Sequence, residues 1–251
     1  MSGMLMLLLA GFSGLVGILI GASSIGGVLL VPFLTYYVGI DVHAAIGAAM
    51  FSYIFAGAAG AWFYARRGSI DWSLAGWLIL GAMPGAFLGS VVKSTASGPA
   101  LEGLIGLLLL FAAYTALRPV KGGAAPARAT ANPVLILLGG LVGFGSAMSG
   151  TSGPLILLPL LLWLDIPVLT TIGVAQAVQF PIALLATGAN FFSGDIALPA
   201  GLVIAAALVA GIAAGAAFAH ALSPSALKRG VAWIVLVVGI GIFVRLFATQ
   251  F

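Results

Sequence analysis

Cysteine is absent from this sequence, and charged side chains are scarce. Among 251 residues, nine are Lys or Arg, five are Asp or Glu and two are His, so charged residues make up 6% of the chain. Without cysteine, disulfides, iron–sulfur clusters and thiol catalysis are excluded. The formal charge of +4 comes from the shortage of acids and not from a basic patch, so we expect no nucleic-acid partner.

Apolar residues take the place of the missing charges. They make up 63% of the sequence, and the mean hydropathy is +1.28. No water-facing surface can be assembled from this composition, so the lipid bilayer must surround most of the chain. The first residues lack the basic region of a cleavable signal peptide, and we therefore expect the first apolar stretch to belong to the folded protein.

Charged and turn-rich sites divide the chain into eight apolar segments, and a spanning helix needs about 20 apolar residues. The segments cover residues 3–38, 44–65, 73–92, 101–118, 133–164, 168–192, 197–220 and 226–248. The longest hydrophilic stretch follows the fourth segment and is rich in Pro and Gly, which is typical of a linker. The sequence thus predicts an all-α polytopic membrane protein, with membrane units at residues 1–118 and 133–251 and a cytoplasmic linker at residues 119–132.

Two of these segments, residues 3–38 and 133–164, are too long for one crossing and too short for two. Each contains a run of Gly, Ser and Thr, at residues 21–27 in the first and 145–154 in the second. Such runs break a helix, and a broken backbone at membrane depth is tolerated only where protein or a water-filled cavity surrounds it. We therefore expect two broken helical hairpins that enter the membrane and turn back.

The chain also repeats itself at an offset of 126 residues. The glycines that coincide at this offset are Gly17 with Gly143, Gly27 with Gly153, Gly47 with Gly173, Gly68 with Gly194, Gly85 with Gly211 and Gly89 with Gly215. The register holds from residue 15 to residue 89, and it superimposes the two broken segments. This pattern indicates a duplicated unit, in which each copy is a broken hairpin followed by three transmembrane helices.

The positive charges indicate how the two copies are oriented. If each hairpin returns to its own side, each copy makes three full crossings and the copies must be inverted. Seven Lys and Arg residues then share one face and two, Lys93 and Arg245, lie on the other, whereas a full crossing at each break gives six against three. Because cytoplasmic loops carry an excess of Lys and Arg, the sequence predicts two inverted repeats with both termini extracytoplasmic.

Inverted repeats with discontinuous helices indicate a transporter whose substrate site lies near the membrane midplane. Broken helix ends expose N–H groups and the positive end of the helix dipole, and Ser and Thr hydroxyls add donors, which together suit a small anion. The alternative is that the small residues let helices pack closely and that the hydroxyls bond their own backbone. The substrate-binding residues predicted at the breaks are Ser23, Ser24, Gly26, Gly27, Ser149, Thr151, Ser152 and Gly153.

Further polar residues in the segments after the breaks join the predicted site: Ser52, Gln176 and Gln179. An amide inside an apolar helix faces the bundle, because an unpaired amide in hydrocarbon is costly. Gln179 can contact the substrate or bridge two helices, and the sequence leaves both interpretations open. Glycines at GxxxG spacing on unbroken helices predict close helix packing without a binding role, and they include Gly17, Gly81, Gly85 and Gly89.

The titratable residues form no catalytic or metal-binding pattern. The sequence contains no HExxH motif and no Cys/His cluster, so we expect no catalytic residue, metal or cofactor. The two histidines are expected near an interface, where a solvated imidazole is usual. All the carboxylates lie in or beside predicted loops, so the usual marker of proton coupling is missing and a coupling proton or sodium ion stays an open question. They are Asp41, Asp71, Glu102, Asp165 and Asp195.

The two broken segments carry similar motifs. Residues 14–17 (GLVG) are followed by residues 24–32 (SIGGVLLVP), and residues 140–143 (GLVG) by residues 152–159 (SGPLILLP). These motifs resemble the sulfite exporter TauE/SafE family, and the resemblance covers nearly the whole chain. It implies a protein of the bacterial inner membrane that moves sulfite, organosulfonates or related sulfur and carbon anions. The second hairpin departs from the pattern, because Ser-Gly replaces the Gly-Gly of the first copy.

The leading hypothesis from the sequence is a secondary transporter or exporter of a small sulfur-containing anion, with its site between the two breaks. A passive anion channel is the nearest alternative, because no clear coupling group is visible. A transporter of a non-sulfur carboxylate is the other alternative. An intramembrane enzyme lacks the motifs that such chemistry needs.

Overall fold

The computed structural model describes residues 3–24, 26–117, 132–218 and 224–248, and these ranges are helical without a strand. The helices are α1 (Gly3–Ser23), the 3-10 helix η1 (Gly26–Leu29), α2 (Leu30–Phe33), the π-helix η2 (Leu34–Val38), α3 (Val42–Ala65), α4 (Trp72–Thr95), α5 (Gly98–Leu117), α6 (Asn132–Ser149), α7 (Pro154–Trp163), α8 (Val168–Phe192), α9 (Leu198–Phe218) and α10 (Pro224–Ala248). The linker expected at residues 119–132 lies outside the described ranges, apart from Asn132.

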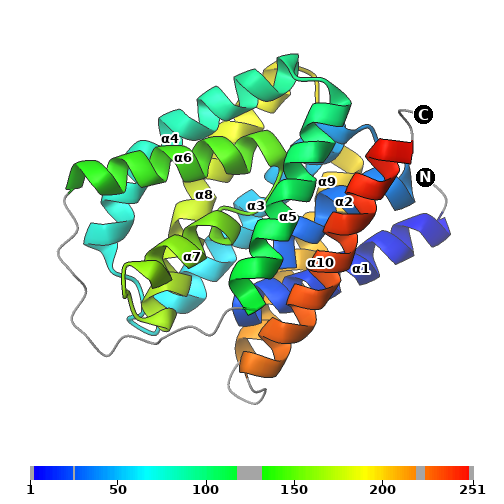
Figure 1. Cartoon of the computed structure of the whole chain (residues 1–251). Helices are drawn as coiled ribbons and strands as arrows, with labels where there is room; N and C mark the ends of the chain where they lie inside the picture. Colours follow the sequence, from blue (N-terminus) through cyan, green and yellow to red (C-terminus); the bar gives the residue numbers. More distant parts are fainter. Residues whose placement is uncertain (1–2, 25, 118–131, 219–223, 249–251) are drawn as a thin grey trace.

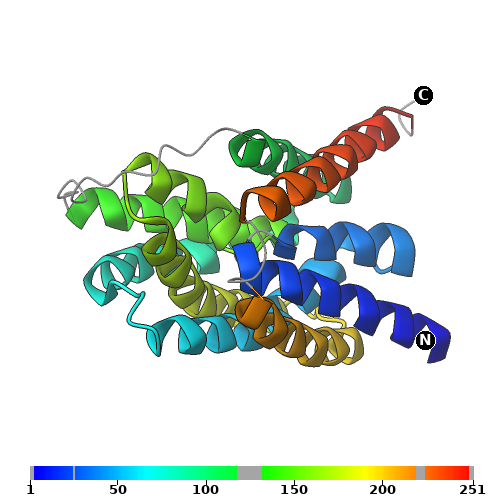
Figure 2. The same cartoon turned by 90° about the horizontal axis from the view of Figure 1, so that it is seen from below.

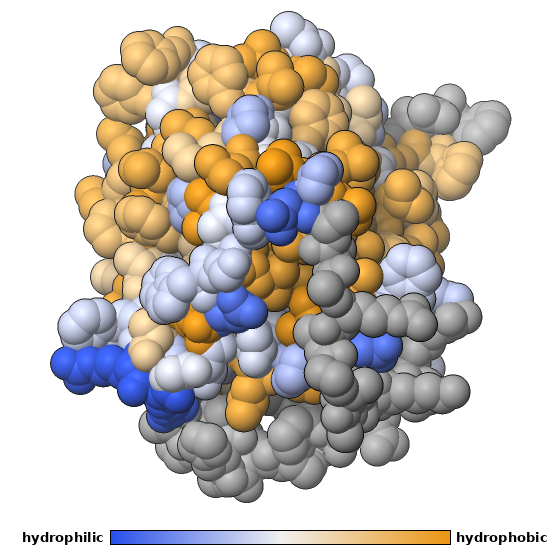
Figure 3. Space-filling view, turned by 90° about the vertical axis from the view of Figure 1, so that its left-hand side faces the viewer, coloured by the Kyte–Doolittle hydropathy of each residue, from blue (hydrophilic) through white to orange (hydrophobic). Residues whose placement is uncertain are grey.

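Seven helices in the described ranges are long and apolar enough to cross a membrane. A helix satisfies its own backbone hydrogen bonds, which is why an apolar chain crosses lipid in this form. Large apolar side chains also face outward, and among the most exposed are Leu7 at 75%, Leu137 at 65% and Phe192 at 91%. Figure 3 shows one end of the molecule, where apolar residues border a central and lower area with more hydrophilic residues. The prediction of an all-α polytopic membrane protein is confirmed.

Both long segments are broken where the sequence predicted. The chain leaves α1 through Ser24, whose φ is +60°, and it leaves α6 through Gly150, whose φ is +65°. After the first break the chain folds back on α1. The stacked rings of Phe12 in α1 and Phe33 in α2, with centroids 3.8 Å apart, show this return. After the second break α7 returns toward α6, since a Cβ on Gly145 would lie 3.0 Å from Ile156 Cδ1.

The helices after each break begin at matching positions. The first residues of α3 and α8, of α4 and α9, and of α5 and α10 are each separated by the 126-residue offset seen in the sequence. Every positive-φ residue in the described ranges also has a partner at this offset. The pairs are Ser24 with Gly150, Gly39 with Asp165, and Gly68 with Gly194. The two halves therefore share their turns as well as their helices.

Glycines hold helices of the two halves together. A Cβ on Gly81 of α4 would lie 1.8 Å from the carbonyl oxygen of Ile136 in α6, and Gly85 and Gly89 approach α6 in the same way. Gly17 of α1 also approaches α9 closely, because a Cβ on Gly17 would lie 2.6 Å from the Leu208 carbonyl oxygen. The predicted packing role of these glycines is confirmed, because only a hydrogen at Cα fits these contacts.

Two further pairs of helices, α3 with α8 and α5 with α10, run antiparallel. In the centre, Gly47 near the start of α3 contacts Asp195 just after α8, while Gly60 near the end of α3 contacts Gln176. At the edge, α5 packs along α10, as Figure 2 shows from below. Figure 1 shows that α1 begins and α10 ends on the same side of the molecule.

One charged residue lies where the sequence predicted a loop. The segment expected to end at residue 92 continues as α4 to Thr95, and Lys93 is completely buried within it. Its Nζ donates to Asp195 Oδ2 at 3.0 Å, and the carbonyl oxygen of His43 lies 3.4 Å away. The helix therefore extends three residues past the approximate end of the apolar segment, where a carboxylate distant in sequence compensates the ammonium.

Candidate functional site

The two helix breaks meet at the centre of the molecule. A Cβ on Gly27 would lie 2.7 Å from the Ser152 hydroxyl oxygen and 2.9 Å from the Tyr53 hydroxyl oxygen. Tyr53 is fully buried and donates a hydrogen bond to the carbonyl oxygen of Gly27. Since Tyr53 lies halfway along α3, this contact lies near the middle of a membrane-spanning helix.

The first break is tied to α8 of the other half. Gln176 Nε2 donates to Ser24 Oγ at 3.0 Å, and both side chains are fully buried. The Gln176 side chain packs against Gly60 of α3, where a Cβ would lie 2.6 Å from Gln176 Oε1. The positive φ of Ser24 is uncommon for a residue with a side chain and costs about 1–3 kcal/mol, so this hydroxyl is held in place against a conformational penalty.

The second break is held by its own hydroxyls. Ser149 Oγ donates to the Gly145 carbonyl at 2.6 Å and lies 2.8 Å from Thr151 Oγ1. At Gly150, a Cβ would lie 2.7 Å from Val31 Cγ2 of the first hairpin. Ser149 and Thr151 therefore shape the turn, and Gly150 allows the two hairpins to touch.

Several buried polar atoms around this contact have no hydrogen-bond partner among the described residues. They are Ser146 Oγ, Ser152 Oγ, Gln176 Oε1 and both amide atoms of Gln179. Helix α7 begins directly after the second break. Its N-cap residue is Gly153, so no side chain caps the helix there. Buried polar groups are nearly always paired in proteins, so the unpaired ones beside this helix end make the contact between the two breaks the candidate site.

The other predicted residues are placed more peripherally. Gly26 packs against α1, with 2.7 Å from a Cβ there to Leu19 Cβ, and Ser52 Oγ donates to the Ala49 carbonyl at 2.7 Å. Gly153, in contrast, belongs to the central cluster, because a Cβ there would lie 3.8 Å from the Gln179 Cα of α8. Ser23 ends α1, and its side chain lies outside the described atoms. Of the predicted set, Ser24, Gly27, Ser152, Gly153, Gln176 and Gln179 come together.

Tyr53 and Ser146 also belong to this cluster, although the prediction did not include them. Tyr53 coincides with Gln179 at the 126-residue offset, so the repeat itself could have identified it. The side chains gathered here are uncharged, so the site offers hydrogen-bond donors without a fixed positive charge. Within the described ranges no group of three or more His, Cys, Asp or Glu residues is placed to hold a metal ion.

A comparison with protein families identifies the same family that the two motifs resemble. The family model for the sulfite exporter TauE/SafE matches residues 6–242, which include both broken hairpins and most of α10. Neither the curated proteins nor the solved structures gave a match. Since the family match spans nearly the whole chain and its members are membrane transporters, this chain belongs to the sulfite exporter TauE/SafE family of multi-pass transporters.

Proposed function

We propose that this protein is a secondary transporter that exports a small sulfur-containing anion, such as sulfite or a sulfonate, across the bacterial inner membrane. The anion binds near the midplane, between the two broken hairpins. The observation that carries this proposal is the contact of Gly27 with Ser152, surrounded by buried polar atoms that lack a partner.

The chemistry of the cluster suits a small oxyanion. The Ser152 hydroxyl and the Gln179 amide can donate hydrogen bonds from one side, and the Ser24 hydroxyl can donate from the other. The uncapped end of α7 adds a partial positive charge. Donors without a fixed Lys or Arg bind an anion and also allow its release, which a transporter requires on every cycle.

Two inverted copies of one unit explain how such a site forms. The antiparallel course of α3 with α8 and the fold-back of each hairpin support the inversion. The seven-to-two distribution of Lys and Arg supports the inversion independently, and it also supports an extracytoplasmic position for both termini. In this arrangement the two breaks approach the midplane from opposite faces.

The described conformation is closed around the site. No atom beyond a hydrogen fits on Gly27 between Ser152 and Tyr53, so the anion enters only when the two hairpins move apart. Separation toward one face and then the other gives alternating access, whereas a passive channel would need a continuous opening.

Transport by the purified protein in proteoliposomes tests this function. We expect labelled sulfite or sulfoacetate to move and, under an imposed ion gradient, to accumulate against its own gradient. Movement without accumulation under any gradient would identify a passive channel. Movement of a labelled dicarboxylate with neither sulfur anion would identify a carboxylate transporter, and no movement by folded protein would reject transport of these anions.

The variant Ser152→Ala tests the site, because it removes one unpaired hydroxyl and adds no bulk. A hydrogen bond to a charged group contributes about 1.5–3 kcal/mol, so we expect the apparent affinity to fall roughly tenfold or more. Ser13→Ala is the matched control, since Ser13 is also buried with an unpaired hydroxyl but lies in the middle of α1. Equal affinity in both variants would remove Ser152 from the site.

A further inference from the structure

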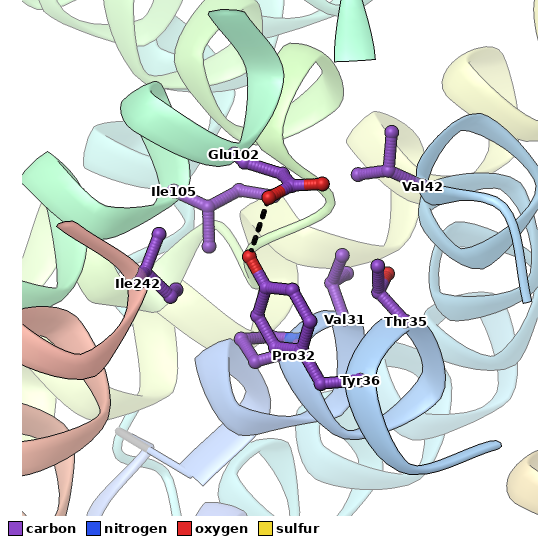
Figure 4. Close-up of a pocket in the computed structure, with 8 residues that line it drawn as sticks. All are labelled: Val31, Pro32, Thr35, Tyr36, Val42, Glu102, Ile105 and Ile242. Carbon is purple, nitrogen blue, oxygen red and sulfur yellow. Dashed lines mark hydrogen bonds between the residues drawn. The ribbon is translucent and has the colours of Figure 1, made fainter. Parts of the chain in front are cut away.

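A second polar cluster lies between the first hairpin and helices α5 and α10. Tyr36 in the π-helical segment η2 donates a hydrogen bond to Glu102 Oε2 of α5 at 2.7 Å (Figure 4). The guanidinium carbon of Arg245 in α10 lies 4.4 Å from the centroid of the Tyr36 ring. A phenol, a carboxylate and a guanidinium therefore meet where the returning arm of the hairpin touches these two helices.

A small cavity lies beside this cluster. Its volume is about 10 Å³, which is near the minimum for one water molecule. Thr35 also lines it, and the Thr35 hydroxyl oxygen is buried without a hydrogen-bond partner among the described residues. The remaining walls are apolar and consist of Val31, Pro32, Val42, Ile105 and Ile242. A carboxylate and an unpaired hydroxyl thus share a cavity that can admit a water.

The polar residues that the first half contributes to this cluster are not repeated in the second half. At the 126-residue offset, the residues that coincide with Thr35, Tyr36 and Glu102 are Leu161, Leu162 and Lys228. Packing requirements common to both halves therefore do not explain the polar residues here. The π-helical turn that carries Tyr36 is itself rare, and such turns occur frequently at functional sites.

We propose that Glu102 is the proton-coupling carboxylate of this transporter, an inference that rests on the transport function proposed above. Ionised Glu102 accepts the Tyr36 hydrogen bond, and a proton arriving from water on a carboxylate oxygen converts it to a neutral acid. Charge-assisted hydrogen bonds are roughly twice as strong as neutral ones, so protonation loosens the attachment of the first hairpin to α5.

The coupling follows from what the same hairpin carries. Ser24 and Gly27 at its break form one side of the anion site, and the chain runs from that break through η1 and α2 into η2, which carries Tyr36. A hairpin released from α5 is freer to move away from Ser152. Proton binding at Glu102 therefore changes how readily the anion site opens.

The groups around Glu102 favour a proton over a metal cation. Tyr36 faces it from η2 and Arg245 approaches Tyr36 from α10. Helix α3 contributes Val42 to the lining of the cavity. The neighbouring His43 forms a hydrogen bond with Asp41 and does not line the cavity. Hard cations take about six oxygen ligands, and the lining of this cavity includes only three side chains with oxygen atoms.

The test compares two measurements with labelled sulfite in proteoliposomes, after subtraction of empty vesicles. Exchange without a gradient reports the anion site, and net flux under an imposed pH gradient reports coupling. We expect the gradient to accelerate the wild type, and we expect Glu102→Gln to lose this acceleration while exchange remains. Asp165→Asn is the matched control, because this exposed carboxylate lies in a loop and Asn also tolerates its φ of +60°.

Each outcome decides a different claim. Equal acceleration in Glu102→Gln and the wild type would overturn the coupling role, as would acceleration by a sodium gradient in place of the pH gradient. Absence of exchange in the wild type would reject the proposed transport function instead.

If Glu102→Gln also loses exchange, Tyr36→Phe decides the question. This variant keeps the carboxylate but removes the hydrogen bond through which its protonation acts on the hairpin. Exchange should therefore remain while the acceleration by the pH gradient is lost, and full acceleration in Tyr36→Phe would overturn the proposal.

Discussion

Ser24 has a backbone conformation that glycine adopts without a steric penalty. Its φ of +60° matches the +65° of Gly150 at the equivalent position of the other half. In one half the turn is made by glycine, and in the other a serine makes it and offers its hydroxyl to Gln176. The turn itself needs only a residue at positive φ, whereas the hydrogen bond to Gln176 needs the serine hydroxyl.

Two substitutions at Ser24 make this separation measurable. Ser24→Ala and Ser24→Gly both remove the hydroxyl, but only alanine keeps a Cβ at positive φ, which costs about 1–2 kcal/mol. We expect Ser24→Ala to be less stable than Ser24→Gly by about that amount in thermal unfolding in detergent. Both should lose sulfite transport to a similar extent. Equal stability would contradict the strained turn, and transport at the wild-type rate would contradict a role for the hydroxyl.

The ion pair of Lys93 and Asp195 is unequal in its burial. The Lys93 side chain is 0% exposed and that of Asp195 is 27% exposed. Removal of one partner from a fully buried pair costs about 3–5 kcal/mol, because the other charge stays uncompensated. The loss of stability in this protein therefore depends on whether the buried Lys93 ammonium or the partly exposed Asp195 carboxylate is left without a partner.

We therefore expect Asp195→Asn to destabilise the protein more than Lys93→Met. The first leaves a buried ammonium without its counterion, whereas the second leaves a carboxylate that water reaches. The expected loss for Asp195→Asn is about 2 kcal/mol, which is below the range for a fully buried pair because Asp195 is itself partly exposed. Thermal unfolding of both variants and of the double variant measures this, and the opposite order would show that Asp195 is the worse residue to leave unpaired.

At the scale of elements, the close approach of α4 and α6 depends on glycine. Gly81→Ala places a methyl group where the Ile136 carbonyl oxygen already lies, at 1.8 Å. The helices must separate, and overpacking of this kind costs about 1–3 kcal/mol.

Gly76→Ala is the matched control on the same helix. Its Cβ would meet nothing within 4 Å, so the higher helix propensity of alanine should stabilise the protein by up to about 1 kcal/mol. Opposite shifts in unfolding temperature are expected for the two variants. A similar shift in both would mean that α4 and α6 are not held at the described distance.

Local signals explain which elements could be predicted. The breaks after Ser23 and Ser149 follow from runs of Gly and Ser that disrupt a helix wherever they occur. The end of α4 could not be predicted, because Lys93 is stabilised by Asp195, which is 102 residues away. The same holds for Tyr36 and Glu102, which are 66 residues apart. Hydropathy identifies helices, but pairing across such distances needs the fold.

At the scale of the whole molecule, the two proposals depend on the inverted arrangement in different ways. The anion site needs breaks that approach the midplane from opposite faces. The coupling carboxylate needs the halves to be unequal, so that only one hairpin is attached through a titratable group. In the proposed arrangement, duplication with inversion would supply the first property, and the difference between residues such as Glu102 and Lys228 would supply the second.

The absence of cysteine makes the inversion directly testable, because any introduced thiol is unique. Arg67 and Ser193 are exposed, occupy equivalent positions in the two halves, and each precedes a positive-φ glycine. Arg67→Cys and Ser193→Cys should react with a membrane-impermeant maleimide from opposite faces, with Ser193→Cys labelled in intact cells and Arg67→Cys only after lysis. Equivalent positions of parallel copies would label from the same face, and that result would leave the two breaks without a common midplane at which to bind an anion.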